Sequence, residues 1–257
     1  NGTTFTLTLT HADQDAYSVG SMALTMPSMG SISIAQNTGG NGIGGYDDKM
    51  PSAWEETWGT SLGTSIDLAK GVSSSMNIQY KTPSFSGTTL AVAYAPKNDG
   101  AMVNDKGVSG GGVSHLGSGY DLMLDSTIAG QNVFLGYSTT ERSPAKKSGT
   151  NADNMTDVQE GVAGIILNIG PLKVGAQATA EWKGENQLAS AAAGYRNVMY
   201  GAAFNVNDNL SISYGRMESK KGFTSNDTAT VQMEIDSIQV AYTMGGATLK
   251  IAETEAD

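Results

Sequence analysis

One segment of the sequence alternates apolar and polar residues for longer than a strand of a soluble protein normally does. In Leu172–Trp182 every second residue from Leu172 onward is apolar, and the residues between include Lys173, Gln177 and Glu181. Successive side chains of a strand point to opposite faces, so this segment has one apolar and one polar face. Its eleven residues match the roughly 9–11 that a tilted strand needs to cross a bilayer, against about 5–6 for an ordinary strand. We therefore predict a membrane-crossing β-strand.

Composition agrees with a fold that has no large solid core. Hydrophobic residues make up 39% of the 257 residues, charged residues make up 16%, and there are 33 glycines. A large apolar interior would be hard to build from such a sequence. A barrel with an apolar exterior and a polar interior does not need one. No change in composition divides the chain, so we expect a single domain over residues 1–257.

The period-two pattern recurs in about thirteen segments. Short turns such as Gly170–Pro171 and Gly245–Gly246 alternate with longer polar segments, as in membrane β-barrels. No run of eighteen apolar residues occurs, so transmembrane helices are not expected. The predicted fold class is all-β: a transmembrane antiparallel β-barrel that is apolar outside and wet inside. The polar residues expected to face its lumen are Asn77, Gln79, Asp121, Asp125, Lys173, Gln177 and Glu181.

A segment of nearly forty residues, 37–74, separates the strand Ser31–Gln36 from the alternating run that begins at Ser75. It is too long for a hairpin connection, and compact domains rarely carry such a segment without a function for it. Its aromatic residues argue against disorder. We predict a loop folded into a cavity. Trp54 and Trp58 are four residues apart, so we expect them to pack from one side of a short helix against the inner wall.

The residues after this loop resemble a known family. Asn77–Gly87 and Leu90–Pro96 are similar to the hairpin that follows the constriction loop of general diffusion porins, with marine or alphaproteobacterial porins most similar. Those proteins are trimeric, sixteen-stranded barrels of the Gram-negative outer membrane, and the loop after their fifth strand folds into the pore. The resemblance implies that residues 37–74 are the pore constriction loop and that Lys81 is a basic residue of the pore wall.

Counting strands against this family gives three before the loop and ten after it. If the loop follows strand five, two strands precede Asn1 and one follows Asp257, which completes sixteen. The resemblance also implies that loop acids face Lys81 across the narrowest part of the pore, so that a transverse field selects among hydrated solutes. The alternative is a solvated acidic loop, and the sign of the ion selectivity stays open. The acids concerned are Asp47, Asp48, Glu55, Glu56 and Asp67.

The expected function is passive diffusion of ions and small hydrophilic solutes through a water-filled channel in the outer membrane. The expected partners are those solutes, the lipid bilayer, lipopolysaccharide and two further copies of the chain in a homotrimer. The formal net charge of -10 and the pI of about 4.6 argue against nucleic acid, which requires a basic surface. The alternative is a secreted or surface-layer structural or adhesive β-protein.

We expect neither catalysis nor a cofactor. The chain has no cysteine, and its two histidines, His11 and His115, have no metal-ligand spacing and no catalytic-triad partners. An outer-membrane barrel hydrolase is therefore disfavoured. Calcium held by oxygen ligands of the acidic loops is a weaker alternative to solvated charge. The acids that could supply such ligands, beside those of residues 37–74, are Asp99, Asp105, Asp153 and Asp157.

Overall fold

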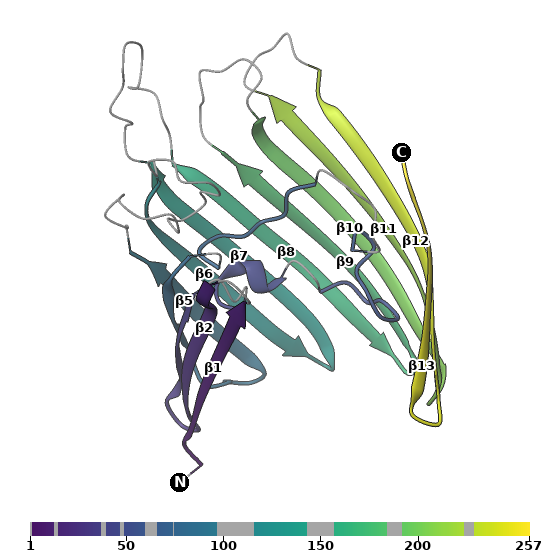
Figure 1. Ribbon diagram of the computed structural model, residues 1–257, viewed down its shortest axis with the longest axis horizontal. Helices are drawn as coiled ribbons and strands as arrows, with labels where there is room; N and C mark the ends of the chain where they lie inside the picture. The colour runs from purple at the N-terminus through teal and green to yellow at the C-terminus, as the bar shows by residue number, and fades with distance from the viewer. Residues whose placement is uncertain are drawn as a thin grey trace.

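The computed structural model describes residues 2–12, 15–36, 40–46, 49–59, 66–73, 75–96, 116–142, 157–183, 192–223 and 229–257. In this part of the chain thirteen antiparallel strands form one sheet, in sequence order (Figure 1). The strands are β1 (Thr4–Ala12), β2 (Asp15–Met26), β3 (Gly30–Gln36), β4 (Asn77–Lys81), β5 (Thr88–Ala95), β6 (Leu116–Ile128), β7 (Gln131–Arg142), β8 (Val158–Ile169), β9 (Leu172–Trp182), β10 (Ala192–Asn207), β11 (Leu210–Phe223), β12 (Val231–Met244) and β13 (Ala247–Ala256).

The all-β fold class is confirmed, and the period-two pattern located every one of these strands. β9 has the bounds that alternation predicted. β10 begins at Ala192, six residues before the alternating apolar run Val198–Val206, because its outer part contains glycine and Arg196 in place of apolar residues. β1 pairs only with β2, and β13 only with β12, among the described strands. The sheet is therefore a strongly curved trough, and these thirteen strands alone do not close the predicted cylinder.

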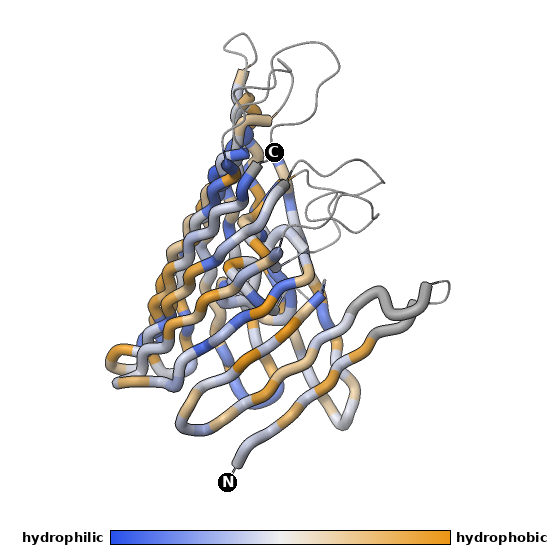
Figure 2. The backbone as a smooth tube through the Cα atoms, turned by 90° about the vertical axis from the view of Figure 1, so that its left-hand side faces the viewer, coloured by the Kyte–Doolittle hydropathy of each residue, from blue (hydrophilic) through white to orange (hydrophobic). Residues whose placement is uncertain are grey.

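The convex face of the sheet is apolar. Figure 2 shows hydrophobic and hydrophilic residues alternating along the strands. Tyr200, Ile212 and Val174 are among the large apolar side chains that the convex face leaves exposed, at 49%, 41% and 37%. Such an extended apolar surface fits hydrocarbon rather than water. Among the described residues, no helix is long and apolar enough to span a membrane.

The concave face is less uniformly wet than the sequence predicted. Apolar side chains of the sheet and of the segment 37–74 pack into two dry clusters. The first includes Ile43, Val72 and Phe134, and the second includes Met217 and Ile235. The reason is that part of the concave face is covered by the chain itself, so water is excluded there.

The expected helix around Trp54 and Trp58 is absent from the described residues, which contain instead a short 3-10 helix, η1 (Ile43–Tyr46). The backbone near Trp54 bonds to the wall rather than to itself, because the N–H and C=O of Glu55 both bond to the side chain of Gln239. Trp58 packs against the second apolar cluster. The Trp54 indole Nε1 donates to the carbonyl oxygen of Ile251, at 3.2 Å.

Candidate channel constriction

The segment between β3 and β4, residues 37–74, lies along the concave face, and we call it the inner loop. Its described parts are residues 40–46, 49–59 and 66–73. It crosses the trough from the β3 side toward β9–β12 and returns to β4 (Figure 1). Asp47 and Asp48, two of the acids expected to act here, lie outside the described residues.

The carboxylate of Asp121 on β6 holds both ends of the inner loop. It accepts hydrogen bonds from the backbone N–H of Ile43 at 2.8 Å and of Val72 at 3.0 Å. Gly42 and Gly71 have φ values of 72° and 51°, and a Cβ on either would lie 2.2 or 2.3 Å from Asp121 Oδ2. Only glycine combines this backbone conformation with such a close approach. Asp121 therefore faces the concave side, as predicted for a lumen residue, but it contacts protein.

Two amide side chains of β4 hold the first turn of the loop. Asn41 Nδ2 donates to Asn77 Oδ1 at 2.8 Å, and the N–H of Gly42 donates to Gln79 Oε1 at 2.9 Å. Asn77 Nδ2 also donates to the carbonyl oxygen of Val72, at 3.1 Å. Asn77 and Gln79, both predicted to face the lumen, are thus used to satisfy loop backbone and side-chain groups.

Tyr46 of η1 attaches the middle of the loop to three strands. Its ring stacks on Phe134 of β7 at a centroid distance of 5.2 Å, and its hydroxyl donates to Asp125 of β6. Gln177 Nε2 of β9 donates to the Tyr46 carbonyl oxygen at 2.7 Å. Burial and the Asp125 carboxylate raise the pKa of Tyr46, so the phenol keeps its proton and remains a donor.

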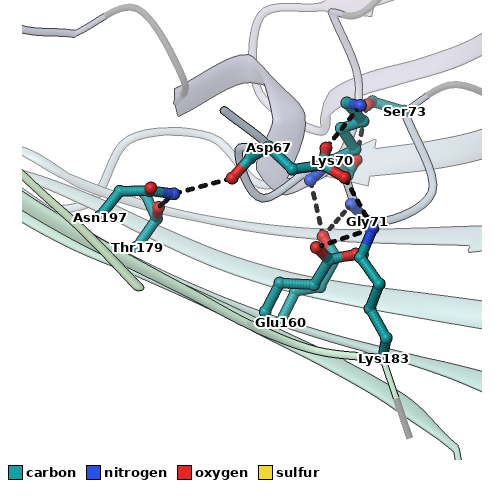
Figure 3. Close-up of polar contacts among 9 residues, drawn as sticks. Asp67, Lys70, Gly71, Ser73, Glu160, Thr179, Lys183 and Asn197 are labelled. Atoms are coloured by element: carbon teal, nitrogen blue, oxygen red, sulfur yellow. Dashed lines mark hydrogen bonds and ion pairs between the residues drawn. The ribbon is translucent and has the colours of Figure 1, made fainter. Parts of the chain in front are cut away.

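Asp67 attaches the far part of the loop to β9 and β10 (Figure 3). Its carboxylate accepts from Lys183 Nζ at 2.7 Å and from Lys70 Nζ at 2.8 Å, and its carbonyl oxygen accepts from Asn197 Nδ2 at 2.8 Å. Burial alone would raise the pKa of Asp67, but the two lysines outweigh burial and lower that pKa below its ordinary 3.8. The loop therefore carries an ionised carboxylate here at neutral pH.

A second wall carboxylate binds the loop beside Asp67. Glu160 of β8 accepts hydrogen bonds from the backbone N–H groups of Lys70 and Gly71, both at 2.6 Å (Figure 3). Glu181, a predicted lumen residue, lies opposite Glu160 in the ladder, and its Oε2 is 3.5 Å from Lys183 Nζ. Charge-assisted bonds of this kind are stronger than bonds between neutral groups.

The remaining predicted residues lie apart from this cluster. Lys81 lines a cavity of about 220 Å³ with Lys49, Tyr46 and Asp125. Lys173 is exposed on the concave face near the short turns. The other described loop acids, Glu55 and Glu56, lie over β11 to β13: Glu55 bonds to Gln239 and lies close to Lys250. Asp67 is therefore paired with Lys70 and Lys183 rather than facing Lys81, as the family resemblance implied.

Sequence reasoning missed several residues that hold the loop. Glu160, Asn197 and Gln239 each lie at a concave position of their strand, so period-two alternation was the signal that could have identified them. Lys183 lies one residue beyond β9 on the same face as Lys173. The loop partners of Asn197, Gln239 and Lys183 could not be identified from the alternation of residues, because each contact joins segments far apart in sequence.

Comparison with known proteins identifies the family. The model of the Gram-negative porin family matches residues 5–254. The chain belongs to this family. It is an outer-membrane porin that forms a water-filled channel for passive diffusion, in a family of channels rather than enzymes. The predicted family, location and channel function are thereby confirmed. A search of curated proteins found no match.

Solved structures share the porin fold at low sequence identity. OmpF of Salmonella typhi, in complex with daunomycin, has a TM-score of 0.64 and 14% identity, over 95% of this chain and 78% of that one. The outer membrane channel DcaP of Acinetobacter baumannii has a TM-score of 0.59 and 11% identity, over 97% of this chain and 72% of that one. The trimer form of OmpT, an outer membrane protein of Vibrio cholerae, has a TM-score of 0.56 and 15% identity, over 99% of this chain and 86% of that one.

The close approach of Gly42 to Asp121 predicts the effect of Gly42→Ala. A Cβ would displace the carboxylate and detach the loop, so we expect larger single-channel conductance and faster proteolysis of the loop. Gly170→Ala is the matched control, because Gly170 also has positive φ but no atom within 4 Å of its added Cβ. Both changes carry the left-handed backbone cost of about 1–2 kcal/mol. Equal conductance changes in the two variants would contradict the role of Asp121.

The pairing of Asp67 predicts how acid affects the loop. Because the folded-state pKa lies below the ordinary 3.8, the ion pairs contribute fully above that value and are lost as pH falls through the folded pKa. We expect constant current noise from pH 7 to about pH 5 and increased noise below pH 3.8. Asp67→Asn should be noisy at every pH, losing about 1–3 kcal/mol of loop attachment. Quiet recordings of Asp67→Asn at pH 7 would refute this attachment.

Proposed function

We propose that the inner loop is the constriction of this porin and that the channel prefers anions. The proposal rests on a difference between the acidic and the basic residues of the concave face. Carboxylates there are engaged in holding the loop, whereas several lysines are not. The proposal therefore concerns the local charge of the solute path rather than the net charge of the chain.

Four concave or loop carboxylates are committed to partners. Asp121 and Glu160 accept loop N–H groups, Asp125 accepts the Tyr46 hydroxyl, and Asp67 is paired with Lys70 and Lys183. Two further acids lie beside lysines: Glu55 is close to Lys250, and Glu181 is close to Lys183. A carboxylate paired with a lysine contributes little field to solutes at a distance. Asp121 and Glu160 keep their charge but are buried beneath the loop, at 1% and 9% exposed.

Three lysines on the concave face supply positive charge to the path. Lys81, Lys173 and Lys221 form no ion pair with any carboxylate in the ranges that the structure describes. Lys81 lines the cavity between loop and wall, and Lys221 lies over the Tyr195 ring at 5.7 Å. Rings of like charge along a pore attract the oppositely charged ion.

Acids that contribute to the net charge of -10 lie partly outside this path. Glu218, Glu234 and Asp236 alternate with the buried concave residues Met217 and Ile235, and therefore point from the convex face. Their field reaches the channel only across the wall and through solvent, where salt screens it within about 8–10 Å. Net charge alone would predict cation preference, and the distribution of charge predicts the opposite.

Reversal potentials in a KCl gradient across a planar bilayer test the proposal. We expect the wild-type channel to favour chloride, and Lys81→Gln with Lys173→Gln to shift the permeability ratio toward potassium. The shift should be up to about fivefold per lysine, because one charge exerts about 1 kcal/mol at 4 Å in water. Lys220→Gln, which removes a lysine from the convex face, is the matched control and should leave the ratio unchanged. A cation-selective wild type would refute anion preference.

We also infer that the edges of β1 and β13 are paired by further strands in the membrane, because an unpaired edge is too costly in hydrocarbon. Three strands would complete sixteen, and the trimer form described for Vibrio cholerae OmpT supports a homotrimer. Native mass spectrometry of the complex extracted from outer membranes tests both points. We expect three equal subunits, each heavier than 26.6 kDa; a monomer, or subunits of 26.6 kDa, would contradict them.

A further inference from the structure

A polar cavity lies between the first part of the inner loop and the wall formed by β4, β5 and β6. Its volume is about 220 Å³, which corresponds to about seven water molecules and is below the roughly 300–1,000 Å³ of pockets for drug-sized ligands. Three loop glycines border the cavity, Gly40, Gly42 and Gly45, and none of them has a side chain that would fill it. The cavity is therefore of a size that suits one sugar ring.

The floor of this cavity is apolar. It includes Ala91 of β5 and Met123 of β6, which are directly opposite each other in the sheet. Both side chains are buried and belong to the first apolar cluster of the concave face. The C–H groups of an organic molecule can lie on such a surface, whereas an inorganic ion would lose water there without gaining a partner.

Three hydrogen-bond donors on the wall of the cavity have no partner in the part of the chain that the structure describes. Lys81 Nζ of β4 and Thr89 Oγ1 of β5 both line the cavity, and neither forms a hydrogen bond or ion pair there. Gln79 accepts the N–H of Gly42 through Oε1, and its Nε2 is the third such donor. A molecule in the cavity would therefore meet an ammonium, an amide and a hydroxyl group.

Asp125 of β6 adds an acceptor on the opposite side of the cavity. Its Oδ2 accepts the Tyr46 hydroxyl, which leaves Oδ1 without a hydrogen bond among the described residues. Asp125 is directly opposite Thr89 in the sheet. Because a hydroxyl group both donates and accepts, one hydroxyl group of a ligand can bond to Asp125 and to Thr89 at once.

The charges around the cavity restrict the class of the ligand. Lys81 provides an ammonium group for a carboxylate, and Lys49 lines the loop side of the cavity. Asp125 opposes a second negative charge on the ligand, as do Asp47 and Asp48, which precede Lys49 in the sequence. A phosphate monoester is therefore less suitable than a monoanion. An amino acid is also less suitable, because its ammonium group would lie in a cavity that two lysines already line.

We propose that this cavity binds a sugar acid, a monosaccharide with a single carboxylate, as the solute passes the constriction. The carboxylate of the ligand binds Lys81 and Gln79. One of its hydroxyl groups bridges Thr89 and Asp125, and a C–H face of the ring lies on the apolar floor. The inference deepens the proposed function and rests on the inner loop being the constriction. It does not require that chloride is preferred over potassium.

Titration calorimetry of the full-length protein in detergent tests the site, with galacturonate as the ligand and with galactose and acetate as probes of its two halves. We expect galacturonate to bind about tenfold or more tightly than either probe. Lys81→Gln should weaken galacturonate binding about tenfold or more, and Thr89→Val, which removes only a hydroxyl group, should weaken it about threefold to tenfold. Lys173→Gln, the matched change outside the cavity, should shift the chloride-to-potassium permeability ratio yet bind galacturonate as the wild type does.

Two results would overturn the proposal. Galacturonate binding no tighter than acetate binding would show that the ring makes no contribution, and unchanged galacturonate binding by both Lys81→Gln and Thr89→Val would place the ligand elsewhere. Either result leaves the anion preference of the channel standing if the wild type favours chloride. Conversely, galacturonate that binds in detergent but never interrupts the single-channel current in a planar bilayer would refute the inner loop as the constriction. Interruptions that Thr89→Val shortens, at an unchanged permeability ratio, would support the site whichever ion is preferred.

Discussion

Buried backbone N–H groups of the inner loop need acceptors, and the wall of the sheet supplies them from alternate positions of its strands. Asp121 and Glu160 each accept at least two loop N–H groups, and Gln239 both donates to and accepts from Glu55. A buried polar group without a partner costs about 1–3 kcal/mol. The position of the loop in the channel therefore depends on carboxylates and amides that point inward.

This requirement explains why several polar concave residues do not line open water. The alternation of β9 and β4 correctly placed Gln177 and Asn77 opposite the apolar face, yet both are almost fully buried, at 2% and 1% exposed. Period-two patterning reports only the side of the sheet, because it depends on strand geometry. Whether that side meets water or protein depends on a segment more than thirty residues away along the chain.

The sheet could be predicted almost completely from the sequence, and the site only in outline. The bounds of β9 follow from local alternation, and the length of residues 37–74 with their aromatics indicated a folded loop. The helix expected around Trp54 failed because i,i+4 spacing ignores the competition of Gln239 for the backbone of Glu55. The partner of Asp67 was missed for a similar reason: Lys183 is 116 positions away, and no local pattern joins them.

Glycines of the wall make room for the inner loop, whereas carboxylates of the wall bind it. A Cβ on Gly136 would lie 2.8 Å from Ile43 of the loop, and a Cβ on Gly201 would lie 2.7 Å from the carbonyl oxygen of Pro51. Glycine lowers strand stability, since it adds no packing surface and loses more conformational freedom on folding. At these two positions that loss is offset by contact with the loop.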